Sequence, residues 1–253
     1  MSKTTVAVIF GGCSSEYEIS LLSASSIIRN IPKDKYEIIM LGITKEGHWL
    51  LFNGDVDEIE NGTWEQHSEN RTAFLSPDRG IHGIVMETEY GFSAIRIDVI
   101  FPVLHGEFGE DGTIQGLFEL SGIPYVGMGV MASANGMDKT SSKIVFASAD
   151  IPQADWVVVN KTDNFEDKMD EIENKLGYPC FVKPARTGSS VGVGKAHDRK
   201  ELKAALENAA QFDRKILVEE NIDGHEVECA VLGNEDVKAS TVGEIMPTVE
   251  FYD

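Results

Sequence analysis

The sequence predicts an α/β fold whose first part is a doubly wound parallel sheet. The apolar run Val6–Phe10 ends at Gly11 and Gly12, which predicts a buried parallel strand that opens into a tight turn. A helical pattern over residues 18–28 and an apolar strand over residues 36–42 complete a β-α-β unit. In such sheets ligands bind beyond the carboxyl ends of the strands, so the turn after the first strand is a candidate site.

The remainder of the first half is less regular. Residues 98–104 predict another buried strand, and a helix through Leu120 follows, for which Gly122 supplies a C-cap. Residues 43–96 are less regular, and the part between the strand-like runs Trp49–Phe52 and Gly91–Arg96 is interpreted as loop-rich surface elaboration. The shorter strand-like runs are Trp49–Phe52, Gly91–Arg96 and Ile123–Gly127.

A second α/β pattern begins after residue 151. Before it, Asp138 can cap a helix over residues 139–149, which Pro152 stops. Apolar residues spaced three and four apart predict two amphipathic helices, at residues 165–176 and 202–212. The predicted strands are Trp156–Val159, Cys180–Lys183, Val191–Val193, Ile216–Glu220, Val227–Leu232 and Val242–Tyr252.

The chain is strongly acidic. It carries 22 Lys and Arg against 42 Asp and Glu, a formal charge of −20, which argues against nucleic acid as a partner because a phosphate backbone attracts basic surfaces. No stretch approaches the roughly 20 apolar residues that span a bilayer, so no membrane partner is expected. Cys13, Cys180 and Cys229 lack the spacing of a disulfide framework or a zinc site, and a cytoplasmic location fits.

The most informative run is Lys183–Lys195, which reads KPARTGSSVGVGK. A lysine ends an apolar stretch, and the small residues after it let backbone N–H groups and serine hydroxyls approach phosphate oxygens. The run is not a Walker A loop, because Ala196 follows the second lysine, and it lacks the strand-to-helix setting of a dinucleotide fingerprint. Taken alone, it fits a glycine-rich hairpin without a ligand as well as it fits a nucleotide site.

Five motifs occur in series along the chain. They are GGCSSEYEIS at residues 11–20, HGEFGEDGT at 105–113, MDK at 137–139, KP and GSSVG within 183–192, and EE and GHE within 219–226. Together they resemble the D-alanine–D-alanine ligases of the ATP-grasp superfamily, over essentially the whole chain. Residues 42–49 and the insert after them look like the longer ligases, which include the D-Ala–D-Ser and D-Ala–D-lactate ligases of glycopeptide resistance.

The resemblance implies a fold and a reaction. The fold is ATP-grasp, with an N-terminal preATP-grasp domain at residues 1–106, a central α+β nucleotide-gripping domain at 107–226 and an incomplete C-terminal domain at 227–253. ATP phosphorylates the carboxylate of one D-alanine, and the amine of a second D-amino acid attacks the acyl phosphate to give a dipeptide for peptidoglycan. A homodimer is expected, as is Mg²⁺, whose ligands are expected beyond residue 253.

The resemblance also implies roles in substrate binding. Glu16 holds the ammonium of the first D-alanine, although an acid near a helix N-terminus also complements the helix dipole. Ser189 links to Glu16 and closes the loop over the substrates, although serines also suit turns. His105 lies near the first substrate's carboxylate, although a lone histidine is more often structural.

The nucleotide is expected to contact a second set of residues. Lys139 and Lys183 are the family's phosphate lysines, and a surface lysine is the plainer alternative for each. Ser190 would contact phosphate oxygens. The adenine and ribose are expected at Glu219, Glu220, Ile222 and Glu226, with Glu220 contributing its backbone, whereas an acidic turn at a strand end is the simpler reading.

The chain ends at Asp253, directly after a strand-like run, and is expected to lack the metal ligands and the arginine of the family's last domain. Because those groups stabilise charge during phosphoryl transfer, a polypeptide of this length is expected to be inactive by itself. The alternatives are a non-catalytic nucleotide-binding fragment and another ATP-grasp carboxylate–amine ligase. The sequence leaves the second substrate open among D-Ala, D-Ser and D-lactate.

Overall fold

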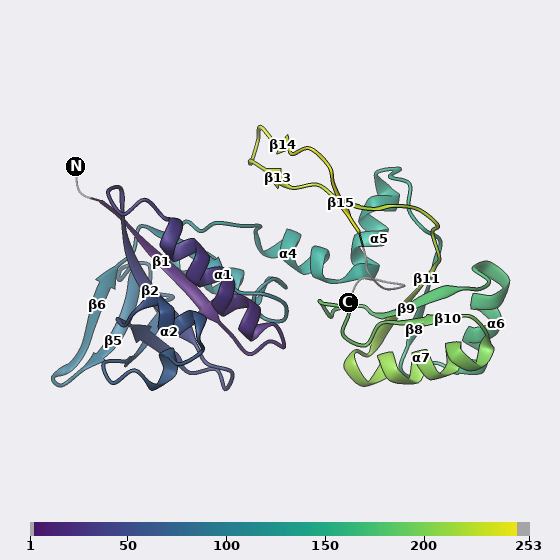
Figure 1. Cartoon of the computed structure of the whole chain (residues 1–253), viewed down its shortest axis with the longest axis horizontal. Coiled ribbons are helices and arrows are strands. Elements are labelled where there is room, and N and C mark those ends of the chain that lie inside the picture. The colour runs from purple at the N-terminus through teal and green to yellow at the C-terminus, as the bar shows by residue number, and fades with distance from the viewer. Residues whose placement is uncertain (1–2, 247–253) are drawn as a thin grey trace. The chain divides into compact units, whose positions relative to one another are not determined.

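The computed structural model describes residues 3–246 of the chain. They form two compact units, within residues 1–145 and 146–253 (Figure 1). The described residues of the first unit contain two hydrophobic clusters, and those of the second contain one. The expected three-part division, with boundaries at residues 106 and 226, stays a prediction. No helix in the described range 3–246 is both long and apolar enough to cross a bilayer.

The first unit is built on a seven-stranded sheet in the order β6-β5-β4-β3-β2-β1-β7. Only its β2-β1-β7 portion is parallel, whereas β3 to β6 run antiparallel, so the predicted parallel sheet is correct for three strands alone. The strands are β1 (Thr4–Gly11), β2 (Tyr36–Ile43), β3 (Trp49–Phe52), β4 (Arg71–Leu75), β5 (Gly83–Thr88), β6 (Gly91–Arg96) and β7 (Val99–Val103).

Helices cover both faces of this sheet. Side chains of a strand point alternately to its two sides, so alternate residues of one strand pack against helices on opposite faces. One set of alternate β1 residues packs with α1 (Tyr17–Asn30), which lies across the sheet in Figure 1. The other set packs with α3 (Thr113–Ser121). The β1 residues are Val6, Val8 and Phe10 on the α1 side and Ala7 and Ile9 on the α3 side.

The interpretation of residues 53–90 as loop-rich surface elaboration is wrong, whereas the strands predicted on either side of them, Trp49–Phe52 and Gly91–Arg96, are confirmed. The strands β4 and β5 were not predicted, yet their residues Ala73, Leu75 and Ile84 are buried in the core. Trp64, in a single 3₁₀ turn (Trp64–Gln66) after α2 (Val56–Glu60), is fully buried with its ring centroid 4.9 Å from that of Phe10. This segment therefore completes the sheet and contributes to the hydrophobic clusters on both of its faces.

The helices after the sheet follow the predicted cap residues. Gly122 ends α3 with φ +67°, and the Asp138 carboxylate accepts the N–H groups of Thr140 and Ser141 at 3.0 and 3.1 Å where α5 (Lys139–Ser148) begins. Residues 123–127, expected to form a strand, make only an isolated bridge between Ile100 and Tyr125. The helix α4 (Val130–Met137) was not predicted.

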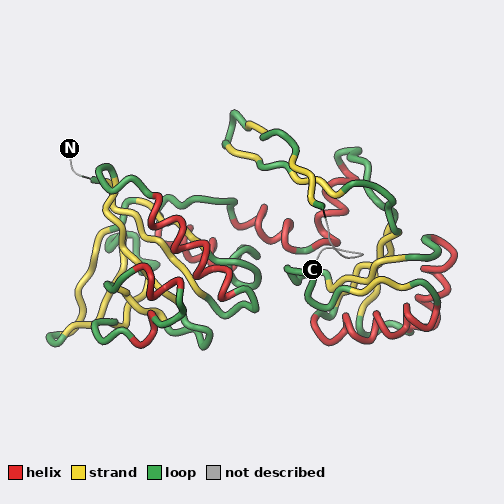
Figure 2. Tube along the Cα trace, in the orientation of Figure 1, coloured by secondary structure: helices red, strands yellow, loops and turns green. Residues whose placement is uncertain are grey.

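The second unit contains an antiparallel sheet in the order β10-β9-β11-β8. Two helices lie beside this sheet (Figure 1 and Figure 2), and their buried residues belong to the same hydrophobic cluster as those of the strands. The strands are β8 (Trp156–Asn160), β9 (Cys180–Pro184), β10 (Gly194–Ala196) and β11 (Lys215–Glu220), and the helices are α6 (Phe165–Lys175) and α7 (Arg199–Phe212).

Three predicted strands of this unit need correction. Residues 191–193 lie in a turn, and β10 begins only at Gly194. The expected strand 227–232 is interrupted at Cys229, and 242–252 is described only up to Met246, with the remainder outside the described residues. The short strands found there are β12 (Glu226–Glu228), β13 (Val231–Leu232), β14 (Lys238–Ala239) and β15 (Gly243–Ile245).

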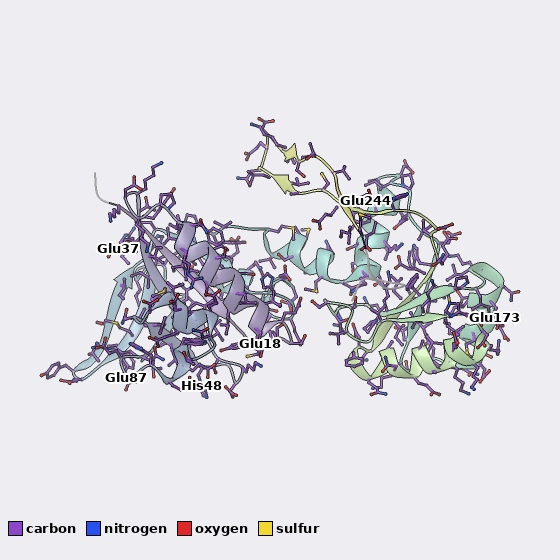
Figure 3. The ribbon with its side chains drawn as sticks, in the orientation of Figure 1. Glu18, Glu37, His48, Glu87, Glu173 and Glu244 are labelled. Carbon is purple, nitrogen blue, oxygen red and sulfur yellow. The ribbon has the colours of Figure 1, made fainter. Side chains whose placement is uncertain are left out.

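Acidic side chains are spread over both units rather than gathered in one place. Figure 3 labels Glu37 on β2 and Glu87 on β5 in the first unit, and Glu173 on α6 and Glu244 on β15 in the second. The charge of −20 is therefore a property of the whole surface, and it favours solubility rather than one ligand.

Candidate active site

The turn after β1 has a conformation that glycine adopts readily. Gly11 and Gly12 have φ of +85° and +105°, and a Cβ added to Gly11 would lie 2.1 Å from the carbonyl oxygen of Ile43. The Gly11 N–H donates to Ser20 Oγ at 2.8 Å, and that hydroxyl donates to the carbonyl of Val103 at the end of β7. The carboxyl ends of β1 and β7 are thus fastened together through α1.

Glu16 lies at this junction. A Cβ added to Gly106, where φ is +69°, would lie 2.2 Å from Glu16 Oε2 and 2.7 Å from Ser14 Oγ. The Glu16 carboxylate therefore packs directly against the backbone of the turn that follows β7. Ser14 Oγ also accepts the N–H of Glu16 at 2.9 Å, which holds the residue at the start of α1.

His105 precedes that glycine and is half-buried. Its Nε2 lies 3.2 Å from the hydroxyl oxygen of Ser23 on α1. The N–H of Gly106 donates to the Glu110 carboxylate at 2.8 Å, which fixes the turn. The first two sequence motifs therefore meet in one place, as the strand-end argument predicted.

A network beside Glu16 fixes the first turn of α1. Tyr17 is 6% exposed, and its hydroxyl accepts the indole N–H of Trp64 at 2.9 Å and donates to Glu65 Oε1 at 2.5 Å. Burial, followed by the bond to the Glu65 carboxylate, raises the pKa of Tyr17 well above its usual value, so the phenol stays protonated. The residue next to Glu16 is thereby bonded to Trp64 and Glu65, which lie in the segment interpreted as loop-rich.

In the second unit, one sheet face carries the candidate nucleotide residues. Cys180 and Val182 of β9 point into the helix-covered core, so Phe181 and Lys183 belong to the opposite face. Lys183 Nζ lies 2.7 Å from Glu219 Oε2, with the side chains 30% and 12% exposed. The carboxylate neutralises and orients the ammonium group.

Phe181 and Lys195 were not assigned a role from the sequence but lie on that face. Phe181 is opposite Lys195 of β10 on one side and Glu219 of β11 on the other. The ammonium groups of Lys183 and Lys195 lie 5.5 and 5.4 Å from the Phe181 ring centroid. An aromatic ring flanked by two cations suits a ligand that combines a flat base with phosphates, and the two-residue period of β9 is the signal that could have revealed it.

The loop after Lys183 is strained. Ser189 and Ser190 have φ of +45° and +56°, a region that costs a residue with a side chain about 1–2 kcal/mol each. The hydroxyl of Thr187 donates to the carbonyl of Val191 at 3.0 Å and helps to hold the turn. Backbone strain of this kind concentrates at ligand sites, and the roles of both serines stay predictions.

The other residues predicted to bind the nucleotide lie in separate segments of the chain. The Glu220 side chain accepts the N–H of Asp155 at 2.8 Å, and the backbone N–H of Glu220 donates to the carbonyl of Asp155 at 3.0 Å, so Asp155 engages both groups of this residue. Ile222 is 65% exposed, Glu226 begins β12, and Lys139 begins α5 and is half-buried. The predicted link between Ser189 and Glu16 joins different units and stays a prediction.

Metal-ligating residues do not cluster in the described part of the chain. Within residues 3–246, no group of three or more His, Cys, Asp or Glu side chains is arranged to hold a metal ion. The described residues therefore do not fit a magnesium site.

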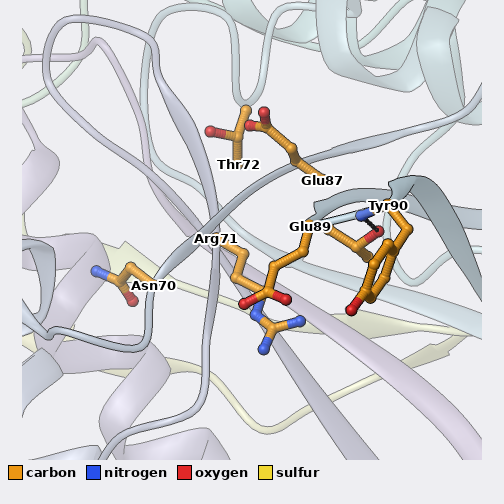
Figure 4. A pocket seen from close by; sticks show the side chains of 7 residues that line it. Asn70, Arg71, Thr72, Glu87, Glu89 and Tyr90 are labelled. Carbon is orange, nitrogen blue, oxygen red and sulfur yellow. Dashed lines mark hydrogen bonds between the residues drawn. The ribbon is translucent and has the colours of Figure 1, made fainter.

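A hollow of about 720 Å³ lies elsewhere, at the outer part of the first unit's sheet. Figure 4 shows its side chains, which come from the start of β4 and from the end of β5 with the turn after it, where the Tyr90 N–H donates to Thr88 Oγ1 at 3.3 Å. No residue predicted for the site contributes to it. The lining residues are Asn70, Arg71, Thr72, Glu87, Thr88, Glu89 and Tyr90.

Known proteins resemble the chain over its whole length. Residues 5–128 match the family model for the D-Ala–D-Ala ligase N-terminus, and residues 145–253 match that for the C-terminus. The D-alanine–D-alanine ligases of Acetivibrio thermocellus and Ruminiclostridium cellulolyticum are each 53% identical, over 99% and 100% of this chain and 70% of each relative.

Solved structures agree. The D-Ala:D-Ser ligase VanG from Enterococcus faecalis superposes with a TM-score of 0.91 at 42% identity, over 100% of this chain and 72% of that one. The D-alanine–D-alanine ligase from Coxiella burnetii gives a TM-score of 0.88 at 33% identity, over 96% of this chain and 71% of that one. The α/β fold is thus that of the ATP-grasp ligases. The chain belongs to the D-alanine–D-alanine ligase family.

Proposed function

We propose that this protein uses ATP to join D-alanine to a second D-amino acid, D-Ala or D-Ser, through a D-alanyl phosphate, in the cytoplasm, for peptidoglycan precursors. The observation that carries the proposal is the packing of the Glu16 carboxylate against Gly106, beside His105, at the carboxyl ends of β1 and β7. Membership of the ligase family supports the reaction type.

Glu16 is proposed to bind the ammonium group of the first D-alanine. A carboxylate held at a strand end accepts charge-assisted hydrogen bonds from an ammonium, which are stronger than those between neutral groups. His105, anchored through Ser23, would lie toward the substrate carboxylate. The substrate would thus be oriented for phosphorylation, and such chemistry depends on positioning and charge stabilisation rather than on a protein nucleophile.

The second unit is proposed to bind ATP on the open face of its sheet. Lys183, oriented by Glu219, would contact the phosphates, together with Ser190 and the neighbouring loop amides. Ser189 would pair with Glu16, and Lys139 would provide a further phosphate contact. The hinge formed by Glu219, the Glu220 backbone, Ile222 and Glu226 would receive the adenine and ribose. The family's reaction also uses Mg²⁺, but none of the residue roles proposed above involves the metal ion.

Nucleotide binding tests the second unit. Calorimetric titration of the chain with ATP should give a dissociation constant that rises by about 10-fold or more in Lys183→Ala, because a charge-assisted contact is lost. Lys200→Ala, which removes an exposed lysine from α7, should leave the constant unchanged. Equal affinity in the wild type and Lys183→Ala would refute the assignment.

D-Alanine binding tests the first unit. Saturation-transfer NMR should detect D-alanine with the wild type and with Glu37→Gln, a change at an exposed position on β2, but not with Glu16→Gln. Binding of L-alanine as strong as that of D-alanine would favour another carboxylate–amine ligase. Nucleotide binding without D-alanine binding would instead favour a non-catalytic nucleotide-binding protein.

Three expectations are tested by further assays of the same chain. Phosphate release with ATP, D-alanine and D-Ala, D-Ser or D-lactate should be absent if the 253 residues are inactive alone, and turnover would contradict that expectation. Analytical ultracentrifugation tests the expected homodimer. A double-mutant cycle of Glu16→Gln and Ser189→Ala on D-alanine affinity tests their link, because uncoupled effects would exclude it.

A further inference from the structure

One hollow in the second unit is lined mainly by basic residues, although the chain as a whole carries a charge of −20. Its volume is about 250 Å³, and it lies at one end of the sheet, where β8, β11 and the segment after β9 meet. We refer to it as the basic pocket. Its lining residues are Asn160, Lys161, Thr162, Arg186, Arg214 and Lys215.

Backbone hydrogen bonds join the three segments that form the basic pocket. The N–H of Lys161 donates to the carbonyl of Arg214 at 2.8 Å, and the N–H of Ala185 donates to the carbonyl of Lys215 at 2.9 Å. Asn160 and Lys215 are also partners in the register of β8 and β11. The basic residues are therefore held together by the sheet and are not gathered by chance from separate flexible loops.

One buried carboxylate orients an arginine of the pocket. Asp213 is 7% exposed and accepts Arg186 Nη2 at 2.6 Å and Nε at 3.1 Å. Burial by itself would raise the pKa of Asp213, but the bonds from Arg186 and from the backbone N–H groups of Lys215 and Arg186 lower it below its usual value. Asp213 therefore stays ionised, and the Arg186 guanidinium keeps a fixed plane.

Two cations of the basic pocket, Lys161 and Arg214, are not balanced by a nearby carboxylate among the described residues. Lys161 and Arg214 form no ion pair with any residue in the described range 3–246. One further carboxylate, Asp163, is engaged by the backbone and side-chain N–H groups of Asn160 at 2.7 and 3.3 Å. Lys161 and Arg214 are thus two cations of the pocket that no carboxylate of the described residues pairs with, on a protein that is otherwise acidic.

We propose that the basic pocket binds a small multivalent oxyanion, such as phosphate or pyrophosphate. Guanidinium and ammonium groups are the side chains that proteins use for phosphate, and an arginine held in one plane suits bidentate contact. The volume is below the 300–1,000 Å³ typical of sites for drug-sized ligands, which selects a small ion. Arg186 belongs to the same loop as Ser189 and Ser190, but none of Lys183, Ser189 and Ser190 lines the pocket, so the proposal does not depend on the proposed function.

Pyrophosphate titration of the intact chain tests the proposal. Calorimetry at low ionic strength should give a dissociation constant that rises by about 10-fold or more in Lys161→Glu/Arg214→Glu, because two charge-assisted contacts become repulsive. Lys33→Glu/Lys200→Glu changes the net charge equally at exposed positions outside the pocket and should bind as the wild type does. Backbone NMR signals of Lys161 and Arg214 should shift during the titration.

Two more variants keep the result decisive. Lys161→Gln/Arg214→Gln removes the charges without adding repulsion and should also weaken binding, which guards against misfolding of the charge-reversed variant. Lys183→Ala should retain pyrophosphate binding. The proposal is overturned if the Lys161 and Arg214 variants bind as the wild type does, if the control double variant loses binding equally, or if Lys183→Ala alone abolishes it.

Discussion

Replacement of Gly106 by alanine should affect D-alanine binding and the free energy of unfolding to different extents. The new Cβ would lie 2.2 Å from Glu16 Oε2, whereas ordinary contacts begin at 3.4 Å, so the carboxylate must move by about 1.2 Å. A carboxylate at the end of a flexible side chain can make that shift cheaply. The cost to the fold is then the φ of +69°, which disfavours alanine by about 1–2 kcal/mol, together with a shift of Ser14 Oγ, which lies 2.7 Å from the same Cβ position.

The fractional loss of the free energy of D-alanine binding should be larger than the fractional loss of the free energy of unfolding. A displaced carboxylate loses a charge-assisted hydrogen bond to the substrate ammonium, which contributes about 1.5–3 kcal/mol and corresponds to roughly 10- to 100-fold in affinity. NMR titration with D-alanine measures the affinity, and urea denaturation measures the free energy of unfolding. Both measurements use the intact chain.

Gly177→Ala provides the matched control. Gly177 has φ of +71°, and nothing lies within 4 Å of the position its Cβ would take. This variant should lose similar stability and retain D-alanine binding. The reasoning is refuted if Gly106→Ala binds D-alanine as tightly as Gly177→Ala does, because the carboxylate position would then not matter.

Two further predictions concern buried groups. Tyr17→Phe should lower the free energy of unfolding by about 1–3 kcal/mol in urea denaturation, because the buried indole N–H of Trp64 loses its acceptor, and unchanged stability would contradict this. Burial raises the pKa of the Cys180 thiol to about 11, so at pH 8.5 iodoacetamide should modify the exposed Cys13 and Cys229 but not Cys180, as read by peptide mass spectrometry. Since the unfolded thiol ionises near pH 8.5 and the folded one near 11, the contribution of Cys180 to stability should be complete below pH 8.5 and decline as the pH rises to 11.

Much of the fold could be predicted because its apolar residues recur at a regular spacing along the sequence. The run Val6–Phe10 and the helix after it were found from hydrophobicity alone, and the meeting of Glu16 with the His105 turn follows from the rule about strand ends. The residues of β4 alternate between exposed and buried, but the strand is only five residues long and lies between turns, so the signal was too short to separate from loop.

Other errors have a local physical cause. Residues 191–193 read as a strand by composition, but the left-handed Ser189, Ser190 and Gly192 turn the chain there and delay β10 to Gly194. The helix α4 contains Gly136 and few large apolar residues, so its propensity and its stripe are both weak. The pairing of Lys183 with Glu219 depends on the register of β9 and β11, which no local pattern specifies.

That register has a consequence for how this sequence can change. Insertion or deletion of one residue within β9 would exchange its two faces, which would place Lys183 against the helices and expose Val182. Single substitutions on the face that carries Lys183 leave the core intact. Insertion or deletion of one codon would instead disrupt both that face and the core. The length of β9 is therefore under a stricter constraint than the identity of most of its residues.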